Sequence, residues 1–247
     1  MLPLQQFVQR DNDTLHVLCN YFFMPPESMN FWEITLFIVA DVLLSLILFA
    51  AAIAILVFLV RKPMRKYKPI DLAIFEKIKP SINPDSNNLM LFITFLGKHQ
   101  FLIPANLVLI FYFLFVTKQT GFSIRIVAIS LSSLVLMFLL KHLFQRKRPL
   151  SPLLKAARGL SFPSGHAIMS VTFYGVLMYI LHNTIRVEGI KYLVTAILIV
   201  LIAFVGYSRL YLRVHYASDV AAGFVIGFLW LVISLAVLKG IDNYIGT

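Results

Sequence analysis

Residues 124–149 read IRIVAISLSSLVLMFLLKHLFQRKRP, an apolar run that ends in a cluster of basic residues. The apolar part, 124–140, approaches the roughly 20 residues that a helix needs to cross a bilayer. The whole chain shares this character, because 60% of its 247 residues are hydrophobic and only 13% are charged. The mean hydropathy is +0.85. About a quarter of the residues in a soluble domain are charged, so this composition indicates a membrane protein.

Six apolar runs are long enough to cross a membrane once flanking interfacial residues are included. They are 34–60, 101–116, 124–140, 167–181, 192–207 and 220–238. The prediction is an all-α, polytopic membrane protein with six transmembrane helices and short interfacial helices.

The chain is predicted to form a single domain over residues 1–247, since it shows no internal repeat and no long linker. Residues 1–33 lack the basic start and uninterrupted apolar core of a cleavable signal, and they are expected to lie at the interface. Residues 61–100 contain four prolines, and their apolar stretch 89–96 is too short to cross. They are expected to lie along the membrane surface, beside a helical core at 101–240.

The formal net charge of +11 raises the possibility of a nucleic-acid partner. The basic residues, however, lie at the ends of apolar runs, with no soluble domain to carry them. Anionic lipid headgroups are therefore the expected partners, and nucleic acid is not.

The order of the spans places the polar clusters on one side of the membrane. Lys141 ends the third span, His166 begins the fourth and Arg209 follows the fifth, while His215 and Asp219 begin the sixth. A single site could use all of them.

The first cluster is KHLFQRKRP, 141–149. Lys141 and Arg148 are seven residues apart, so they share one stripe if the helix continues. Pro149 predicts that the helix ends near Arg148. Both side chains could bind one small anion, and the alternative is snorkelling at the membrane boundary. Other basic residues are interpreted as headgroup contacts or solvated charges: His142, Arg146, Lys147 and Arg213.

The second cluster lies in LSFPSGHAIMSVTF, 160–173. Ser164 can cap the fourth spanning helix, and Gly165 lets the backbone approach a ligand closely. The free N–H groups at a helix start bind anions, and His166 could give a proton to an atom attached to that anion. The alternative is an ordinary serine cap beside an interfacial histidine.

The third cluster is SRLYLRVHYASD, 208–219. His215 and Asp219 are four residues apart, so the carboxylate can accept one ring N–H and leave the other nitrogen free as a nucleophile. Taken alone, such a pair is more often structural than catalytic. Arg209 can meet His215 only if the chain turns within 210–214, a stretch without Gly or Pro.

Three cations, a helix start and two histidines on one face describe a site for a phosphate ester. The three stretches also match the K-x6-R-P, P-S-G-H and S-R-x5-H-x3-D motifs at all eleven fixed positions. Over about 101–240 the chain therefore resembles the type 2 phosphatidic acid phosphatase (PAP2) superfamily. The surface segment before the second span is similar to that of bacterial membrane phosphatases of the phosphatidylglycerophosphatase B and undecaprenyl diphosphatase type.

The resemblance implies a role for each matching residue. His215 would attack phosphorus to form a phosphohistidine, Asp219 would orient His215, and His166 would protonate the leaving alcohol. The phosphate oxygens would be held by Lys141, Arg148, Ser164, Gly165 and Arg209. No metal and no cofactor is implied.

The expected function is hydrolysis of the terminal phosphate of a lipid phosphate or diphosphate. One alternative within the superfamily is phosphoryl transfer to another acceptor, or halide oxidation with vanadate, although the haloperoxidases are soluble. A second alternative is a non-catalytic transporter or lipid-binding protein, for which the paired His215 and Asp219 would be unnecessary.

The expected location is the cell (inner) membrane, crossed several times. Sixteen of the 22 Lys and Arg residues fall on the side of the site, which by the positive-inside rule indicates the cytoplasmic face. The resemblance implies the exterior face. Because catalysis accounts for three of the sixteen and headgroup binding for others, the exterior (periplasmic) face is favoured.

Overall fold

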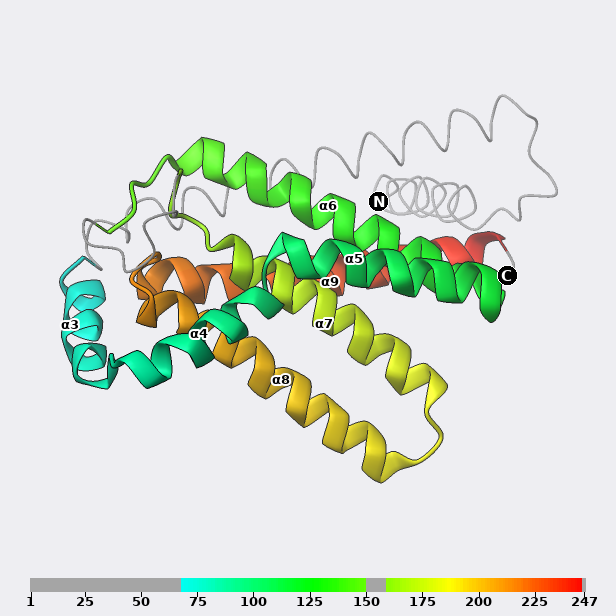
Figure 1. Cartoon of the computed structure of the whole chain (residues 1–247). Coiled ribbons are helices and arrows are strands. Elements are labelled where there is room, and N and C mark those ends of the chain that lie inside the picture. The colour runs from blue at the N-terminus through cyan, green and yellow to red at the C-terminus, as the bar shows by residue number, and fades with distance from the viewer. Residues whose placement is uncertain (1–67, 150–158, 246–247) are drawn as a thin grey trace, which may run out of the picture. The chain divides into compact units, whose positions relative to one another are not determined.

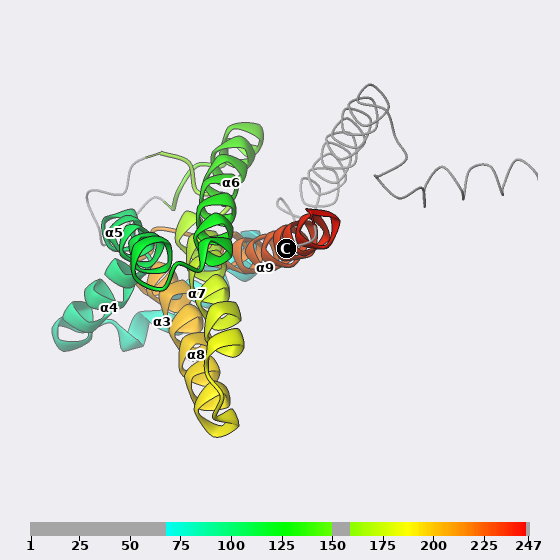
Figure 2. The same cartoon turned by 90° about the vertical axis from the view of Figure 1, so that its right-hand side faces the viewer.

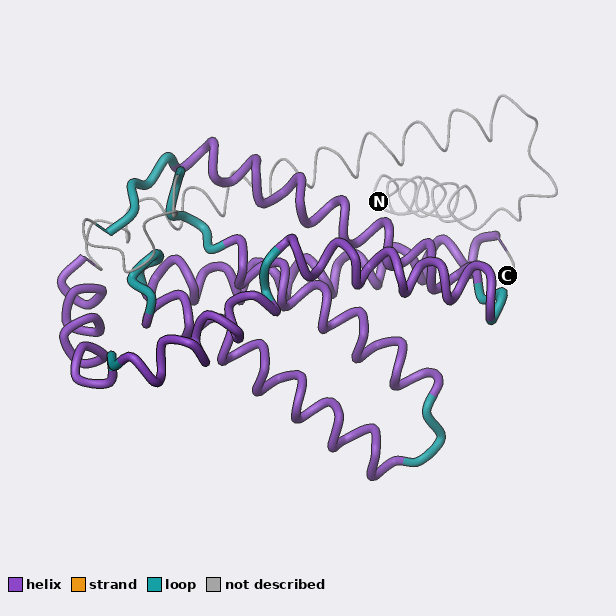
Figure 3. The backbone as a smooth tube through the Cα atoms, in the orientation of Figure 1, coloured by secondary structure: helices purple, strands orange, loops and turns teal. Residues whose placement is uncertain are grey.

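The computed structural model describes residues 68–149 and 159–245, and every regular element within them is a helix (Figure 3). The elements are α3 (Lys68–Ile78), η2 (Lys79–Ser81), α4 (Pro84–Leu96), α5 (His99–Phe111), η3 (Tyr112–Val116), α6 (Thr120–Phe144), α7 (Gly165–Thr184), α8 (Glu188–Tyr211) and α9 (Ala217–Ile245). The predicted all-α fold class is confirmed.

Within the described residues, five helical segments are long and apolar enough to cross a membrane. They are His99–Val116, Thr120–Phe144, Gly165–Thr184, Glu188–Tyr211 and Ala217–Gly240. Each contains one of the five predicted spans that fall in the described part of the chain. The predicted span 34–60 and the predicted interfacial segment 1–33 lie outside the described residues.

Helix α7 forms the centre of the bundle. It packs against α6, α8 and α9, which surround it when the helices are viewed end on (Figure 2). Its small and polar residues allow this close packing, since Thr172 lies against Ser133 of α6. By contrast, α6 carries an exposed apolar stripe that includes Leu131, Val135 and Phe138. Such a stripe fits contact with lipid tails, because large exposed apolar surfaces are rare on soluble proteins.

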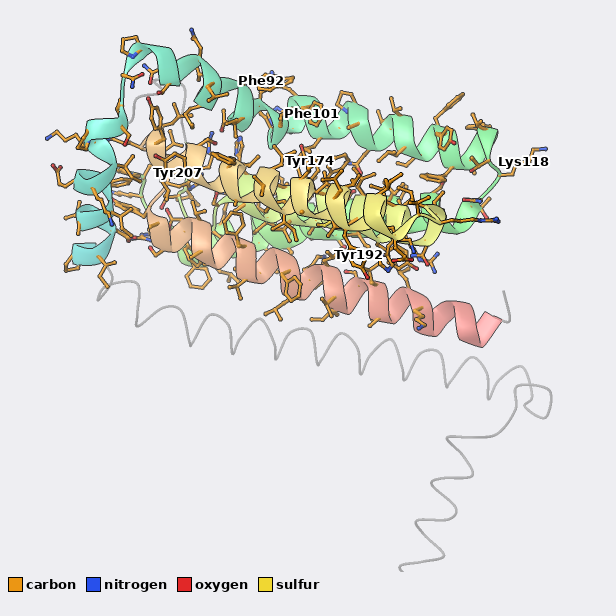
Figure 4. The ribbon with its side chains drawn as sticks, turned by 90° about the horizontal axis from the view of Figure 1, so that it is seen from below. Phe92, Phe101, Lys118, Tyr174, Tyr192 and Tyr207 are labelled. Atoms are coloured by element: carbon orange, nitrogen blue, oxygen red, sulfur yellow. The ribbon has the colours of Figure 1, made fainter. Side chains whose placement is uncertain are left out.

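Four helix ends gather at the same end of the bundle as α3. Figure 1 shows the end of α6, the start of α7, the end of α8 and the start of α9 there. In the view from below, Tyr207 lies toward this end, while Lys118 and Tyr192 lie toward the opposite one (Figure 4). This arrangement is the one that the order of the spans predicts.

Helices α3 and α4 are short and pack against the spanning helices. With thirteen residues, α4 is about 20 Å long and does not reach across a hydrocarbon core of about 30 Å. Its Met90 and Ile93 are buried against Val205 and Tyr211 of α8. The Tyr211 hydroxyl donates to Oδ1 of Asn87 at 3.0 Å. The described part of segment 61–100 is therefore tied to the bundle at the end where α8 terminates.

Candidate functional site

Helix α6 ends at Phe144, four residues before Arg148. The prediction that the helix continues to near Arg148 is wrong, and Lys141 and Arg148 share no helical stripe. Gln145 takes a left-handed conformation, with φ at 46°. Beyond it, the amide of Ser161 donates to the Arg146 carbonyl at 2.7 Å. Pairing with the chain before α7 therefore replaces the helical hydrogen bonds.

Lys141 and Arg148 nevertheless reach the same region. Lys141 Nζ donates to the Leu160 carbonyl at 3.0 Å. Arg148 Nη1 donates to the Val214 carbonyl at 2.8 Å and lies 3.4 Å from Nε2 of His215. Burial lowers the pKa of Arg148 from its ordinary value. Each of the two cations is held by a backbone carbonyl, Lys141 by one before α7 and Arg148 by the one next to His215 in the chain.

The start of α7 has the predicted cap. Ser164 Oγ accepts from the amide of Ala167 at 3.5 Å. The Ser164 amide itself donates to the Asp219 carbonyl at 3.1 Å, which ties the start of α7 to the start of α9. A Cβ at Gly165 would lie 2.5 Å from Sδ of Met137, so glycine lets α7 begin directly against α6.

His166 follows on the first turn of α7. It interacts electrostatically with Arg209, His215 and Arg148. Its Nε2 is buried and has no hydrogen-bond partner among the described residues. This nitrogen is therefore available to exchange a proton with a bound group.

The turn predicted after α8 is present. The helix ends at Tyr211, and Arg213 adopts a left-handed conformation with φ at 54°. The Val214 amide returns to the Arg209 carbonyl at 3.2 Å. Arg209 is buried, its Nη1 donates to Oγ1 of Thr94, and its Nε has no partner within residues 68–149 and 159–245. The turn brings Arg209 to the side of His215.

His215 lies just before α9 and is buried, with 2% of the residue exposed. Its Nδ1 lies 2.7 Å from the Ser161 carbonyl and 3.7 Å from Oδ2 of Asp219. Both neighbours are acceptors, so the proton belongs on Nδ1, and Nε2 carries a lone pair that faces Nη1 of Arg148. The nearer acceptor is the carbonyl, whereas the sequence predicts only the carboxylate.

Burial, aided by the charges of Arg209 and Arg148, lowers the pKa of His215 to about 4. The hydrogen bond and the charge of Asp219 act in the opposite direction. At neutral pH the ring is uncharged. A neutral, oriented imidazole whose Nε2 carries no proton can act as a nucleophile.

Arg146 is not the headgroup contact or solvated charge that the sequence indicates. Its Nη1 donates to Oδ1 of Asp219 at 2.6 Å and to Oγ of Ser218 at 2.7 Å. Its Nη2 donates to Oδ2 of Asp71 at 2.8 Å. The extended chain after α6 turns this side chain inward. His142 and Lys147 are exposed, as predicted.

Sequence reasoning also missed Asp71 and Thr94. Both come from segment 61–100, which carries none of the three motifs, and both contact arginines of the site. Nothing in the local pattern separates them from surface residues. Asp71 is, however, buried next to Ser218, and burial of an acid in this way requires a partner.

The chain is similar to known proteins of one family. The PAP2 superfamily matches residues 122–241. Phosphatidylglycerophosphatase B of Bacillus subtilis (strain 168) is 32% identical over 167 residues, covering 66% of this chain and 78% of that protein. Lipid phosphate phosphatase delta of Arabidopsis thaliana is 31% identical over 85 residues, which are 34% of this chain and 20% of that protein.

A solved structure supports the same relationship. The crystal structure of the transmembrane PAP2 type phosphatidylglycerolphosphate phosphatase from Bacillus subtilis is similar with a TM-score of 0.65 and 29% identity. The similarity covers 81% of this chain and 95% of that one. Motifs, fold and relatives lead to one conclusion: this chain belongs to the PAP2 superfamily.

Proposed function

We propose that the protein is a membrane lipid phosphatase that removes the terminal phosphate of a lipid phosphate or diphosphate through a phosphohistidine at His215. The observation that carries the proposal is the buried, neutral imidazole of His215, with its Nδ1 proton directed at the Ser161 carbonyl and Asp219. The positive charges of Arg209 and Arg148 act on this imidazole.

In the first step, Nε2 of His215 forms a bond to phosphorus as the bond from phosphorus to the leaving oxygen breaks. The leaving group is a lipid alkoxide or, for a diphosphate, the lipid monophosphate. Its oxygen takes a proton from His166. The imidazole becomes positively charged on attack, and Asp219 stabilises that charge. Lys141, Arg148 and Arg209 stabilise the charge on the phosphoryl oxygens, together with the N–H groups at the start of α7.

In the second step, His166 accepts a proton from water, whose oxygen attacks phosphorus. The bond between phosphorus and Nε2 breaks, which releases inorganic phosphate and restores His215. Every proton and electron pair is transferred within this set of residues, so the proposed reaction needs no metal ion.

The proposed substrates are amphiphiles whose tails remain in the bilayer. The relatives are named for phosphatidylglycerophosphate and for lipid phosphate. On this chain, the exposed apolar faces of the spanning helices are suited to lipid tails, while the polar groups of the site gather at one end of the bundle. Phosphatidate, phosphatidylglycerophosphate and polyprenyl diphosphate share this chemistry.

The test is phosphate release from these three lipids by purified protein in detergent, with EDTA present. We expect turnover with EDTA, and inhibition by vanadate, which adopts the five-coordinate geometry of phosphorus under attack. His215→Ala should abolish turnover while membrane insertion survives, because it removes the nucleophile. Asp219→Asn should keep residual activity, because the nucleophile is still present.

Three results would contradict the proposal. Unchanged turnover by His215→Ala would exclude the phosphohistidine. Activity that disappears with EDTA and returns with a divalent ion would exclude the metal-free reaction. No hydrolysis of any of the three lipids would favour a protein that only binds anionic lipid.

A further inference from the structure

A row of three charges, two buried carboxylates and one largely buried arginine, lies behind His215 on the side of its Nδ1. Arg146 stands between two carboxylates, 2.6 Å from Oδ1 of Asp219 and 2.8 Å from Oδ2 of Asp71. The side chains of Asp71, Asp219 and Arg146 are 1%, 0% and 13% exposed. Asp71 lies on α3, outside the 122–241 region that matches the superfamily.

Further contacts hold Asp71 and Arg146 in place. Asp71 accepts from the Ser218 amide at 2.9 Å and from Ser218 Oγ at 2.7 Å. The ring of Tyr216 lies under the Arg146 guanidinium, 4.2 Å from ring centroid to Cζ. Each member of the row therefore has a second contact that restricts its position.

The two oxygens of Asp219 have separate partners. Oδ1 accepts from Arg146, while Oδ2 accepts from the Tyr216 amide at 2.9 Å and lies 3.7 Å from Nδ1 of His215. Arg146 and the Tyr216 amide together hold the two oxygens of Asp219, so that Oδ2 faces the histidine.

We propose that Arg146 and Asp71 are positioning residues of the phosphatase reaction, which hold Asp219 in its orientation and keep the row behind His215 at a net charge of −1. The inference rests on the proposed function. It gives α3, which lies in a segment without family motifs, a positioning role in the active site.

The charge of the row matters because the imidazole becomes positive when Nε2 bonds to phosphorus. Asp219 paired with Arg146 alone would present no net charge to that imidazolium. Asp71 restores the second negative charge, and burial strengthens its effect. Without Arg146, two buried carboxylates would repel each other, and Oδ1 of Asp219 would lose the partner that holds it.

The experiment measures kcat and KM per folded enzyme for four variants, with thermal unfolding measured in parallel. The variants are Arg146→Met, Arg146→Lys, Asp71→Asn and the double variant Asp71→Asn with Arg146→Met. We expect Arg146→Met to lower kcat about 10- to 100-fold, as loss of an outer partner does at metal sites, with little change in KM. Asp71→Asn should lower kcat less, because Asp219 keeps its orientation.

Two variants distinguish a positioning role of Arg146 from a role in folding stability alone. The double variant removes one charge of each sign, so Asp219 no longer faces a second unpaired carboxylate, and kcat should exceed that of Arg146→Met. Arg146→Lys should also recover part of kcat, because it restores the positive charge. Lys147→Met changes the exposed neighbouring residue and is the matched control, with wild-type kcat expected.

The outcomes distinguish the inference from the proposed function. A wild-type protein without hydrolysis would remove the proposed function and this inference with it. An active wild type whose Arg146 and Asp71 variants keep kcat, or change only KM or the unfolding temperature, would overturn the inference alone. If Arg146→Met does not fold, Asp71→Asn and Arg146→Lys decide by the same two measurements.

Discussion

At the scale of single residues, the site separates the two histidines by their hydrogen bonds. His215 has its Nδ1 directed at the Ser161 carbonyl and Asp219, so its role is set before substrate binds. His166 has an Nε2 without a partner among the described residues, which suits a group that gives and takes a proton. Two residues of one type can thus perform nucleophilic and acid–base steps in one site.

The lowered pKa of His215 has a consequence for stability. Its pKa of about 4 in the folded protein lies below the ordinary value of 6.5, so between these values the unfolded chain binds the extra proton. The stability that the neutral ring contributes is complete above pH 6.5 and is lost as the pH falls through 4. We expect the unfolding temperature in detergent to fall over this range, and less steeply for His215→Asn. Parallel pH profiles would contradict the assignment.

The acid role of His166 can be tested with two leaving groups. A lipid alkoxide needs a proton to depart, whereas nitrophenolate departs without one. His166→Ala should therefore slow hydrolysis of a lipid alkyl phosphate about 10²-fold or more, and hydrolysis of a nitrophenyl phosphate ester much less. Initial rates on both substrates decide the matter. Equal losses would indicate that His166 binds phosphate.

At the scale of elements, the site depends on the short distance between the first turns of α7 and α9. The Ser164 amide donates to the Asp219 carbonyl, and Gly223, one turn further along α9, faces α7. A Cβ at Gly223 would lie 2.9 Å from the Ser164 carbonyl and 2.8 Å from Cβ of Ala167. Neither neighbour is the end of a flexible side chain, so the helices would have to separate.

Gly223→Ala should accordingly destabilise the protein by about 1–3 kcal/mol, the usual cost of overpacking. It should also lower kcat, since the same movement separates the phosphate-binding helix start from Asp219. Gly240→Ala is a control in the same helix, because within the described part of the chain nothing beyond the adjoining helix backbone lies within 4 Å of its added Cβ. Thermal unfolding and lipid phosphate hydrolysis measure the two effects, and equal behaviour of the two variants would refute the close contact.

At the scale of the whole molecule, the described bundle has a polar end that holds the site and an opposite end that contains the α7–α8 turn. The density of Lys and Arg at the site end favours the cytoplasmic face by the positive-inside rule. Some of these cations have other contacts, since Arg146 is paired with two carboxylates, and Lys141 interacts electrostatically with Arg148 and Arg209 at the site. We therefore propose an exterior, periplasmic site.

Reporter fusions test this orientation. A site on the exterior face puts the chain after Leu181 and after Leu238 in the cytoplasm. A reporter that is active only in the cytoplasm should then be active at both fusion points. A reporter that requires export should be inactive at both. The reverse result would place the site on the cytoplasmic face and restrict the substrates to lipids of the inner leaflet.

Much of the protein is determined by the sequence alone. Uninterrupted apolar runs specify spanning helices because the backbone must satisfy its own hydrogen bonds in lipid. Five of the six predicted spans fall in the described residues, and each of these lies in a helix. The motifs predict that His166, Arg209 and His215 belong to one site, because the spacing of residues along a helix or a turn is local information.

Only the tertiary structure decides the rest, because it depends on pairing between distant segments. The end of α6 at Phe144 follows from pairing with Ser161, and that pairing turns Arg146 toward Asp219 instead of the lipid headgroups. Asp71 joins the site across 75 residues of chain. No local pattern encodes such a contact, since a buried ion pair between segments exists only after both have packed against the same helices.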